Sequence, residues 1–593
     1  MSPLSSPPLH TGPECDHGCP EFPGLNRGDF NAVVDLQDSY QSYLPMFKAA
    51  VRPPSEGGGG SSSIMSSFSH VNGVDMAANK HLLQDVLRDA FGFGDGLVVT
   101  DWGSISGFER SPQCSNQTCV MQRAQQCLDA GTDMDLRGGY QVLADAVSAG
   151  IVGVELIEKS LRRILAVAFK LGRYDPPESV PWRSIPASAI GSPAHRALAK
   201  EAATKSMVLV QNGADGRHSL PTDVTRVSGI AVTGPSSNAT GDDAIMAYCG
   251  DYAACERCGD GHAVSVATGI AQYLQSAKSP AKLLLSAGCT DGRNGSDTSG
   301  IAEAVAHAQR AEVSHVVVAV GLDGSLEGEG NDRLPSRFPN GIGLPGMQQD
   351  LVNAVVAVGK QTTVVVIGGG AMPITAAGPL VSVIYAPYPG VETGNALAEL
   401  LFGAASPSGR LPFTVPASAQ QLPLYTNFSM VAEPHGRTFG WIAGEGAQPM
   451  HEYGFGLSYT RFKYSTLQLG ARSFDAKAPS DIAVQVTVTN IGAAVSDEVL
   501  QVYAAWQPDD AFEGRVPVRQ LVGFRRLAAV SAGSSRVWKG SIPAEQYALV
   551  DRNGRSVVPT GTLTLSVGGH QPTEYSHSAS GSDCVSKAIT FRA

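Results

Sequence analysis

The spacing of apolar residues divides this chain of 593 residues into regions of different character. From Asp29 to about Arg173, helix-like and strand-like patterns alternate, and the same alternation returns after a proline-rich stretch between Asp175 and Pro193. Beyond about Phe462 the period becomes two, as in strands with one buried face. The pattern predicts two α/β regions followed by an all-β sandwich of about 120 residues.

The first α/β region contains a clear helix followed by a clear strand. Apolar residues recur at helical spacing over residues 79–91, with Asn79 suited to cap the N-terminus and Gly92 to end the helix. The apolar run over residues 96–99 predicts a strand covered on both faces, as in a parallel sheet or barrel. Asp101 follows at the C-terminal end of this strand.

The second α/β region contains several short apolar runs separated by helical patterns, such as the one over residues 346–358. The runs cover residues 207–210, 229–232, 316–320 and 363–367. This alternation predicts a doubly wound sheet. A different kind of segment lies in the first region, where residues 53–63 hold four glycines and three serines in a row and predict a flexible surface loop.

Composition excludes two classes of partner. The net charge of -11 is spread over many segments without a cluster of Lys and Arg, so the chain lacks the basic footprint that nucleic-acid binding needs. No run of 18 or more apolar residues occurs, so no membrane-spanning segment is expected. The share of hydrophobic residues, 43%, with only 16% charged, is typical of a large globular enzyme.

Five of the ten cysteines lie in two local groups, Cys114 with Cys119, and Cys249 with Cys255 and Cys258. Local disulfides are the favoured interpretation. Zinc is the alternative, because Cys255 and Cys258 are followed by His262, but a second well-spaced ligand pair is missing and no metal is expected.

Four Asn-x-Ser/Thr triplets agree with a secretory route, and they begin at Asn116, Asn238, Asn294 and Asn427. We therefore expect an extracellular protein. The first residues have neither a basic nor an apolar segment, so a signal peptide is not visible.

Acidic side chains at two places suggest hydrolysis of a glycosidic bond, which with retention needs two carboxyl groups about 5–5.5 Å apart. Asp101 lies where barrel enzymes place catalytic groups, and Trp102 beside it offers a flat face for a sugar ring. The alternative is that Asp101 caps a turn or helix.

The second acidic place is the loop over residues 321–333, which follows an apolar run and is rich in glycine and acids. The structural alternative is a solvated loop with a turn at Asp332 and Arg333. A phosphate cradle is a weaker alternative, because no Gly-Lys-Ser/Thr follows the glycines and the acids would repel phosphate.

These loops and several other motifs resemble glycoside hydrolase family 3, in particular its β-xylosidase and β-glucosidase branch, over nearly the whole chain after about residue 29. The motifs lie at residues 65–73 (Met-Ser-Ser-Phe-Ser-His-Val-Asn-Gly), 99–103 (Val-Thr-Asp-Trp-Gly), 327–333 (Glu-Gly-Glu-Gly-Asn-Asp-Arg), 388–394, 407–412 and 453–460.

The resemblance implies a role for particular residues. Asp101 matches the nucleophile, and the Glu-Gly-x-Asp-Arg spacing favours Glu329 as the acid/base, with Glu327 as the alternative. Trp102, Phe68 and Met65 are the expected substrate-binding residues, although Phe68 stands where the family commonly has a tyrosine. No cofactor is implied.

The resemblance also implies an architecture: a partial (β/α)8 barrel truncated at its N-terminus, then an α/β sandwich with a mostly parallel sheet, then a fibronectin type III-like β-sandwich. The expected divisions are an unmatched segment (1–28), the partial TIM-barrel domain with the nucleophile (29–177), a linker (178–195), the α/β sandwich domain with the acid/base loop (196–420), a connecting segment (421–461) and the fibronectin type III-like domain (462–593).

The expected function is that of an exo-acting retaining β-glycosidase removing terminal β-D-xylosyl residues from xylo-oligosaccharides. A β-glucosidase is the first alternative, and an inactive carbohydrate-binding or scaffold protein is the second, because half of the barrel is unmatched. The expected partner is an oligosaccharide or aryl glycoside, and the oligomeric state is left open.

Overall fold

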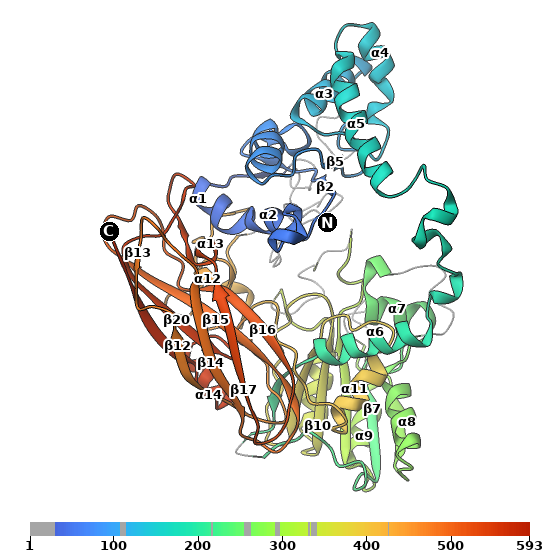
Figure 1. Cartoon of the computed structure of the whole chain (residues 1–593). Helices are drawn as coiled ribbons and strands as arrows, with labels where there is room; N and C mark the ends of the chain where they lie inside the picture. Colours follow the sequence, from blue (N-terminus) through green and yellow to red (C-terminus); the bar gives the residue numbers. More distant parts are fainter. Residues whose placement is uncertain are drawn as a thin grey trace. The chain divides into compact units, whose positions relative to one another are not determined.

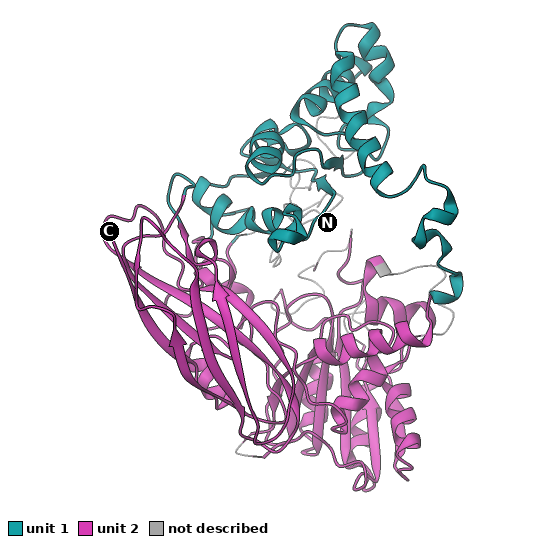
Figure 2. Cartoon of the chain, viewed as in Figure 1, with its two compact units in different colours: residues 1–189, 424–430, 550–555 teal, residues 190–423, 431–549, 556–593 magenta. Residues whose placement is uncertain are grey.

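The computed structural model describes residues 30–106, 114–214, 217–253, 263–290, 297–329, 333, 341–424 and 426–593. The chain folds into two compact units, coloured separately in Figure 2. Unit 1 comprises residues 1–189, 424–430 and 550–555, and unit 2 comprises residues 190–423, 431–549 and 556–593. None of the helices in the described ranges has both the length and the apolar character needed to cross a membrane.

Unit 1 is mainly helical, with two small sheets (Figure 1). One sheet has the order β1 (Asn31–Ala32), β3 (His70–Val71), β4 (Val74–Asp75), and the other pairs β2 (Ser63–Ser66) with β5 (Leu97–Thr100). Its helices are α1 (Leu36–Asp38), η1 (Ser39–Tyr43), α2 (Pro45–Val51), η2 (Pro54–Glu56), η3 (Met76–Ala78), η4 (His81–Ala90), α3 (Gln117–Ala130), η5 (Gly139–Val142), α4 (Leu143–Ser148), α5 (Val154–Lys170), η6 (Pro177–Ser179), η7 (Pro181–Ser184) and η8 (Ala187–Ala189).

The predicted helix and strand before Asp101 are both present. Helix η4 is wound as a π-helix, and Asn79 Oδ1 accepts a hydrogen bond from the Leu82 amide at 3.1 Å, as expected of a cap. Strand β5 runs parallel to β2, and a parallel bridge joins Val99 to Met134 on its other side. Strand β2, strand β5 and the segment at Met134 thus lie side by side and parallel, in chain order. The partial barrel itself stays a prediction.

The glycine-rich segment does not behave as an unattached loop. The Gly59 amide donates to the Ala49 carbonyl at 2.8 Å, and the Ser61 amide donates to Ala50 at 2.9 Å. A Cβ atom on Gly58 would lie 2.1 Å from the Arg52 carbonyl oxygen. The segment therefore packs against the C-terminal end of α2, and the absence of side chains is what permits the approach.

The proline-rich linker also contains structure that its composition does not suggest. Residues 177–189 form the three short turns η6, η7 and η8. Pro193 is the first residue of α6 (Pro193–Ser206), and Ser192 Oγ accepts from the His195 amide at 3.4 Å. A proline at this position costs the helix no hydrogen bond, which is why Pro193 starts α6 and does not extend the linker.

Unit 2 begins with a six-stranded sheet whose order is β6-β11-β10-β9-β7-β8. All neighbouring strands are parallel except β6, which runs antiparallel to β11. The strands are β6 (Val208–Asn212), β7 (Gly229–Thr233), β8 (Lys282–Ser286), β9 (His315–Gly321), β10 (Gln361–Ile367) and β11 (Val381–Ala386). The four predicted strands are present, and β8 and β11 were not predicted.

Consecutive residues along β9 and β11 are all buried, which shows that both faces of this sheet are covered. Helices provide the cover. Helix α11 contacts α6 and α8, and α10 contacts α9. The helices are α6, α7 (Gly241–Cys249), α8 (Val266–Ser276), α9 (Ile301–Gln309), α10 (Gln348–Val356) and α11 (Thr393–Leu401), with the short elements η9 (Asp251–Ala253), η10 (Ala419–Gln421) and α12 (Thr438–Trp441). The predicted helix over 346–358 corresponds to α10.

The C-terminal part of unit 2 is a β-sandwich, as the alternating pattern predicts. Its sheets have the orders β12-β14-β17 and β13-β21-β20-β15-β16. The strands are β12 (Phe462–Leu469), β13 (Ser473–Asp475), β14 (Ile482–Asn490), β15 (Ser496–Pro508), β16 (Gln520–Val530), β17 (Ser535–Ile542), β20 (Gly561–Gly568) and β21 (Val585–Arg592), with the small pair β18 (Leu549–Val550) and β19 (Ser556–Val557) and the helices α13 (Ala544–Tyr547) and α14 (Glu574–Ser580).

The sandwich shares buried polar contacts with the α/β part of unit 2. Arg410 Nη2 donates to Glu498 Oε2 at 2.8 Å, and the Tyr464 hydroxyl donates to Glu498 Oε1 at 2.7 Å. The side chains of Arg410 and Glu498 are 10% and 3% exposed. Burial of an ion pair with its hydrogen bonds satisfied joins the two parts.

Candidate active site

Asp101 stands where strand β5 ends in unit 1. Its amide donates to the Ser66 carbonyl at 3.1 Å, which is the last contact of the β2–β5 pairing. Its carboxylate oxygen Oδ1 accepts from the Trp102 amide at 2.7 Å, and the side chain is half-buried. The turn after the strand therefore holds the carboxylate at the end of the parallel pair, the place at which barrel enzymes carry catalytic groups.

A buried ion cluster fixes the strand that carries Asp101. Asp133 Oδ2 accepts from Arg88 Nη2 at 2.8 Å and from the Val98 amide at 2.9 Å, and Asp133 Oδ1 accepts from Arg163 Nη1 at 3.0 Å. Burial lowers the pKa of the Arg88 guanidinium, against the effect of Asp133. This cluster was not predicted from the sequence, although the charged Arg88 within the apolar pattern of residues 79–91 was a signal for it.

Trp102, the expected sugar platform, is 54% exposed. The guanidinium carbon of Arg137 lies 5.5 Å from the centre of the Trp102 ring, in cation–π geometry. Asp135, which was not predicted, supports the same surface: its Oδ1 accepts from Thr100 Oγ1 at 3.0 Å, and its Oδ2 accepts from the Gly139 amide at 2.5 Å.

Phe68 and Met65 occupy interior positions in unit 1. Phe68 is 2% exposed, and Met65 lines an apolar cavity of about 40 Å³ between α2, β2 and η4. The cavity is also lined by Leu44, Phe47, Ile64, Ser66, Ser67, Met76, Leu82, Leu83, Val86, Leu87 and Phe91. A contact of Met65 and Phe68 with substrate stays a prediction.

The second acidic loop leaves strand β9 of unit 2 at Gly321. Gly321 has φ 138°, and a Cβ atom there would lie 1.8 Å from the Ile367 carbonyl oxygen, so only glycine fits. Its amide donates to Gln348 Oε1 at 2.6 Å, while Gln348 Nε2 donates to its carbonyl at 3.1 Å. This buried glutamine fixes the point from which the loop departs.

The loop itself is a structured turn. Asp323 Oδ1 accepts from the amides of Ser325 and Leu326 at 2.8 and 3.2 Å. Leu322 and Leu326 are each 1% exposed and anchor the turn in the interior. Glu327 and Glu329 follow this anchored turn, and their side chains are partly exposed and exposed, respectively.

Glu327 is committed to an ion pair. Its carboxylate pairs with Arg333, whose side chain is 9% exposed and donates through Nη1 to the Ala371 carbonyl at 2.8 Å. A Cβ atom on Gly370 would lie 2.3 Å from Arg333 Nη2, so the pair rests directly on that glycine. Burial, with Glu327 as the next cause, raises the pKa of the nearby Tyr388 to about 12.

Glu329 has a different environment, at the exposed end of the loop. The Tyr252 hydroxyl donates to Glu329 Oε2 at 2.5 Å, and the Glu329 amide donates to Asp251 Oδ2 at 2.9 Å. The two acids thus have different surroundings: Glu327 is an ion-pair partner, and Glu329, which the motif spacing favours as the acid/base, lies at an exposed position.

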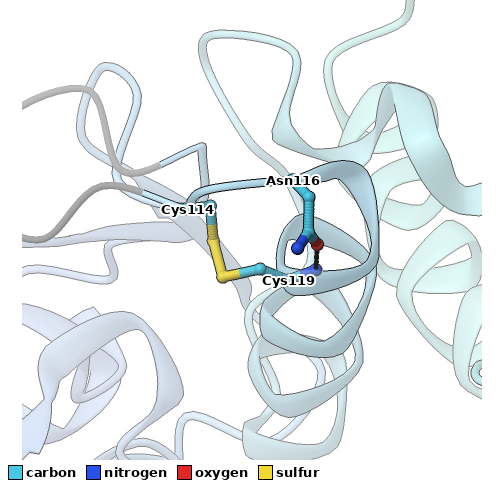
Figure 3. Close-up of a disulfide and its surroundings, with 3 residues drawn as sticks. All are labelled: Cys114, Asn116 and Cys119. Carbon is cyan, nitrogen blue, oxygen red and sulfur yellow. Dashed lines mark hydrogen bonds between the residues drawn. A yellow bond between two sulfur atoms is a disulfide. The ribbon is translucent and has the colours of Figure 1, made fainter.

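The local disulfide prediction is confirmed for Cys114 and Cys119, which Figure 3 shows at the start of α3. Asn116 caps this helix, with Oδ1 accepting from the Cys119 amide at 3.0 Å. Within the described ranges no group of three or more His, Cys, Asp or Glu is arranged to hold a metal. Cys255, Cys258 and His262, the alternative zinc ligands, lie outside the described residues, as do Asn331 and Asp332 of the loop.

Three family models match this chain. The glycosyl hydrolase family 3 N terminal domain matches residues 34–167, its C-terminal domain matches residues 207–459, and a fibronectin type III-like domain matches residues 498–571. A beta-xylosidase of Formosa agariphila is 30% identical over 564 residues, covering 92% of this chain and 72% of that protein. The chain belongs to glycoside hydrolase family 3.

A further relative and two solved structures agree with this assignment. A probable beta-D-xylosidase 6 of Arabidopsis thaliana is 30% identical, covering 92% of this chain and 69% of that protein. A solved family 3 exo-beta-xylosidase, in complex with a xylobiose aziridine activity-based probe, superposes with a TM-score of 0.79 at 26% identity over 96% of this chain and 70% of its own. A β-glucosidase of Erythrobacter marinus superposes at 0.77 and 26% identity over 97% and 72%. The family 3 chain is accordingly a glycoside hydrolase acting on β-glycosides.

Proposed function

We propose that this family 3 enzyme is an exo-acting, retaining β-glycosidase that removes terminal β-D-xylosyl residues from xylo-oligosaccharides. The observation that carries the proposal is the presentation of Asp101 at the end of β5, beside the exposed ring of Trp102. A carboxyl group next to a flat apolar face suits attack on the anomeric carbon of a sugar stacked on the ring.

The reaction follows from two carboxyl groups. Asp101 attacks the anomeric carbon and the glycosidic C–O bond breaks, while Glu329 gives its proton to the leaving oxygen. In the second half, the Glu329 carboxylate takes a proton from water, the water oxygen bonds to the anomeric carbon, and Asp101 leaves. The balance of this reaction needs neither metal nor cofactor.

Glu329 suits the acid/base role better than Glu327. Protonation of Glu327 would weaken its ion pair with the nearly buried guanidinium of Arg333. Glu329 lies at an exposed position, and its carboxylate oxygen Oε2 accepts a hydrogen bond from the Tyr252 hydroxyl, which protonation of the carboxyl group need not break.

Similarity supports xylose as the sugar, because the curated relatives described above are β-xylosidases. A β-glucosidase is the second candidate, favoured by the structural match to the Erythrobacter marinus enzyme. An inactive carbohydrate-binding protein is the remaining candidate. For unit 1 we retain a partial (β/α)8 barrel, supported by the parallel adjacency of β2, β5 and Met134.

Hydrolysis of paired substrates tests the proposal. Purified protein is assayed with p-nitrophenyl β-D-xyloside and β-D-glucoside and with xylobiose, and proton NMR records the anomer released first. The proposal expects preference for xylosides and a β-anomer product. Asp101→Asn should abolish turnover with an unchanged circular dichroism spectrum; oligosaccharide binding without any turnover by the unmodified protein would favour the carbohydrate-binding alternative.

We further propose an extracellular location with N-linked glycans. The Cys114–Cys119 disulfide and the exposed positions of Asn116 and Asn427 support this. Expression in a secreting eukaryotic host, followed by endoglycosidase treatment, should lower the mass of the protein, and an unchanged mass would argue against glycosylation.

A further inference from the structure

Two adjacent residues of unit 2 hold Glu329 from outside its own loop. Asp251 Oδ2 accepts from the Glu329 amide at 2.9 Å, and the hydroxyl of Tyr252 donates to Glu329 Oε2 at 2.5 Å. Both belong to the short turn η9, in which Asp251 lies 78 residues and Tyr252 lies 77 residues before Glu329. One dipeptide thus fixes the main chain and the side chain of the same glutamate.

The glycines of the loop make this contact possible. A Cβ atom on Gly324 would lie 2.9 Å from the Asp251 amide nitrogen, and one on Gly328 would lie 3.1 Å from the Asp251 side chain. On the other side of η9, Gly250 has φ 77° and would bring a Cβ atom to 3.0 Å from the Tyr388 ring. Three close approaches by glycine at one turn indicate that the contact between η9 and the loop is specific.

Several charged or titratable groups surround this contact. The loop itself contributes Asp323 and Glu327, the latter paired with Arg333. Asp251 comes from η9 and Tyr388 from the connection between β11 and α11. The nearby carboxylates of Asp251, Asp323 and Glu327 disfavour the ionised form of Glu329. A hydroxyl group that donates to Glu329 acts in the opposite direction and favours its ionised form.

We infer that Tyr252 is a positioning residue for the acid/base, an inference that rests on the proposed function and on Glu329 holding that role. Its hydroxyl holds Oε2 and so fixes the orientation of the carboxyl group that exchanges a proton with the leaving group. The same hydrogen bond favours the carboxylate form, which is the form needed to deprotonate water in the second half of the reaction.

The hydroxyl has a defined effect on pH dependence. A donor to the ionised carboxylate lowers its pKa, and the basic limb of kcat/KM reports the acid/base of the free enzyme. Tyr252→Phe keeps the ring and removes the donor. The basic limb of this variant is expected to move to higher pH by about half a unit or more.

The nature of the leaving group provides a second readout. A dinitrophenyl β-xyloside needs little protonation of its leaving oxygen, whereas xylobiose needs a full proton transfer. Tyr252→Phe is expected to lower kcat/KM for xylobiose by about five-fold or more, with less than about a two-fold change for the dinitrophenyl substrate. Tyr273→Phe is the control: Tyr273 stacks on Phe402 at 4.8 Å in the same unit, and its loss of a hydroxyl should change neither readout.

The outcomes separate the inference from the proposed function. Glu329→Gln is measured first, and full activity of that variant on xylobiose would overturn the acid/base assignment together with the inference. If Glu329→Gln loses activity on xylobiose but Tyr252→Phe leaves the basic limb in place, the inference alone is overturned. An equal loss on both substrates with an unmoved limb would show a merely structural role and would overturn it as well.

Discussion

Arg88 Nη2 lies 2.8 Å from Asp133 Oδ2 in unit 1, where the two side chains are 1% and 0% exposed. The same Asp133 oxygen accepts from the Val98 amide, three residues before Asp101. The position of the proposed nucleophile therefore depends on a buried ion cluster that makes no contact with the reacting carboxylate in the hydrogen bonds described above. Changes in this cluster should act on stability and geometry together.

Arg163 and Arg162 offer a matched test of that cluster. Arg163 Nη1 donates to Asp133 at 3.0 Å and its side chain is 6% exposed, whereas the Arg162 side chain is 80% exposed and pairs with Glu158. Arg163→Ala should lower the free energy of unfolding by about 3 kcal/mol, because it leaves part of a buried charge uncompensated. Arg162→Ala should cost about 0.5 kcal/mol or less. Urea unfolding measures both, and equal effects would contradict the assigned role.

Substitution by glutamine should affect catalysis at Glu329 and stability at Glu327. Glu329→Gln should lower kcat/KM for xylobiose by about 100-fold or more, since general acid catalysis supplies at least that factor. Glu327→Gln should instead lower the free energy of unfolding by about 1–3 kcal/mol, because Arg333 loses a charged partner. Kinetics and urea unfolding on both variants distinguish the roles. A stable Glu327→Gln protein with the larger kinetic loss would reverse the assignment.

His315 should make stability depend on pH. It is 1% exposed at the start of β9, and its ring nitrogens contact Thr222 Oγ1 at 3.0 Å and Thr363 Oγ1 at 2.9 Å. Burial lowers its pKa from 6.5 to about 4, so the folded state binds this proton more weakly than the unfolded state. Its contribution is fully present above pH 6.5 and is lost as the pH falls toward 4, by up to about 3 kcal/mol.

His315→Gln tests this contribution against the exposed His195→Gln as control. Burial also lowers the pKa of His451 to about 4, so part of the acid sensitivity will persist in the variant. The difference in unfolding free energy between pH 7 and pH 4.5 should shrink in His315→Gln and not in His195→Gln. An identical pH dependence in all three proteins would contradict the prediction.

Gly321→Ala should disrupt the loop that carries Glu329. The added methyl would meet the Ile367 carbonyl oxygen at 1.8 Å, in a backbone conformation that alanine disfavours. We expect a loss of unfolding free energy of about 2 kcal/mol or more, together with a lower kcat. Gly359→Ala is the control, because Gly359 also has positive φ but has no atom within 4 Å of the added Cβ, so about 1 kcal/mol is expected. Thermal unfolding and xylobiose turnover measure both.

Local patterns were sufficient to predict the parts of the fold whose causes are local. The period-two residues Ile482, Val484, Val486 and Val488 are all buried, and the strand before Asp101 lies within one residue of its prediction. Strand β11 was missed although all its residues are buried, because it follows a proline-rich stretch that lacks a helical pattern. Pro193 was read as linker because proline suits both a linker and a first helical turn.

The candidate site depended on contacts between residues far apart in the sequence. Asp133 and Val98 are 35 residues apart, and no spacing rule connects them. The motif spacing favoured Glu329 over Glu327, but the contact of Glu329 with Tyr252, 77 residues earlier in the chain, could not be predicted from it. The glycine-rich segment was predicted to be flexible from its composition. Composition does not reveal that glycines, which lack side chains, allow this segment to pack closely against the end of α2.

The buried pair of Arg410 and Glu498 has a consequence for how unit 2 denatures. Loss of the sandwich alone would break this ion pair and the hydrogen bond from Arg410 Nε to the Gly569 carbonyl at 3.0 Å, so partial unfolding loses contacts that both parts share. The α/β sheet and the sandwich should then unfold in a single cooperative transition in calorimetry. In that case the fibronectin-like part stabilises the sheet that carries Glu329.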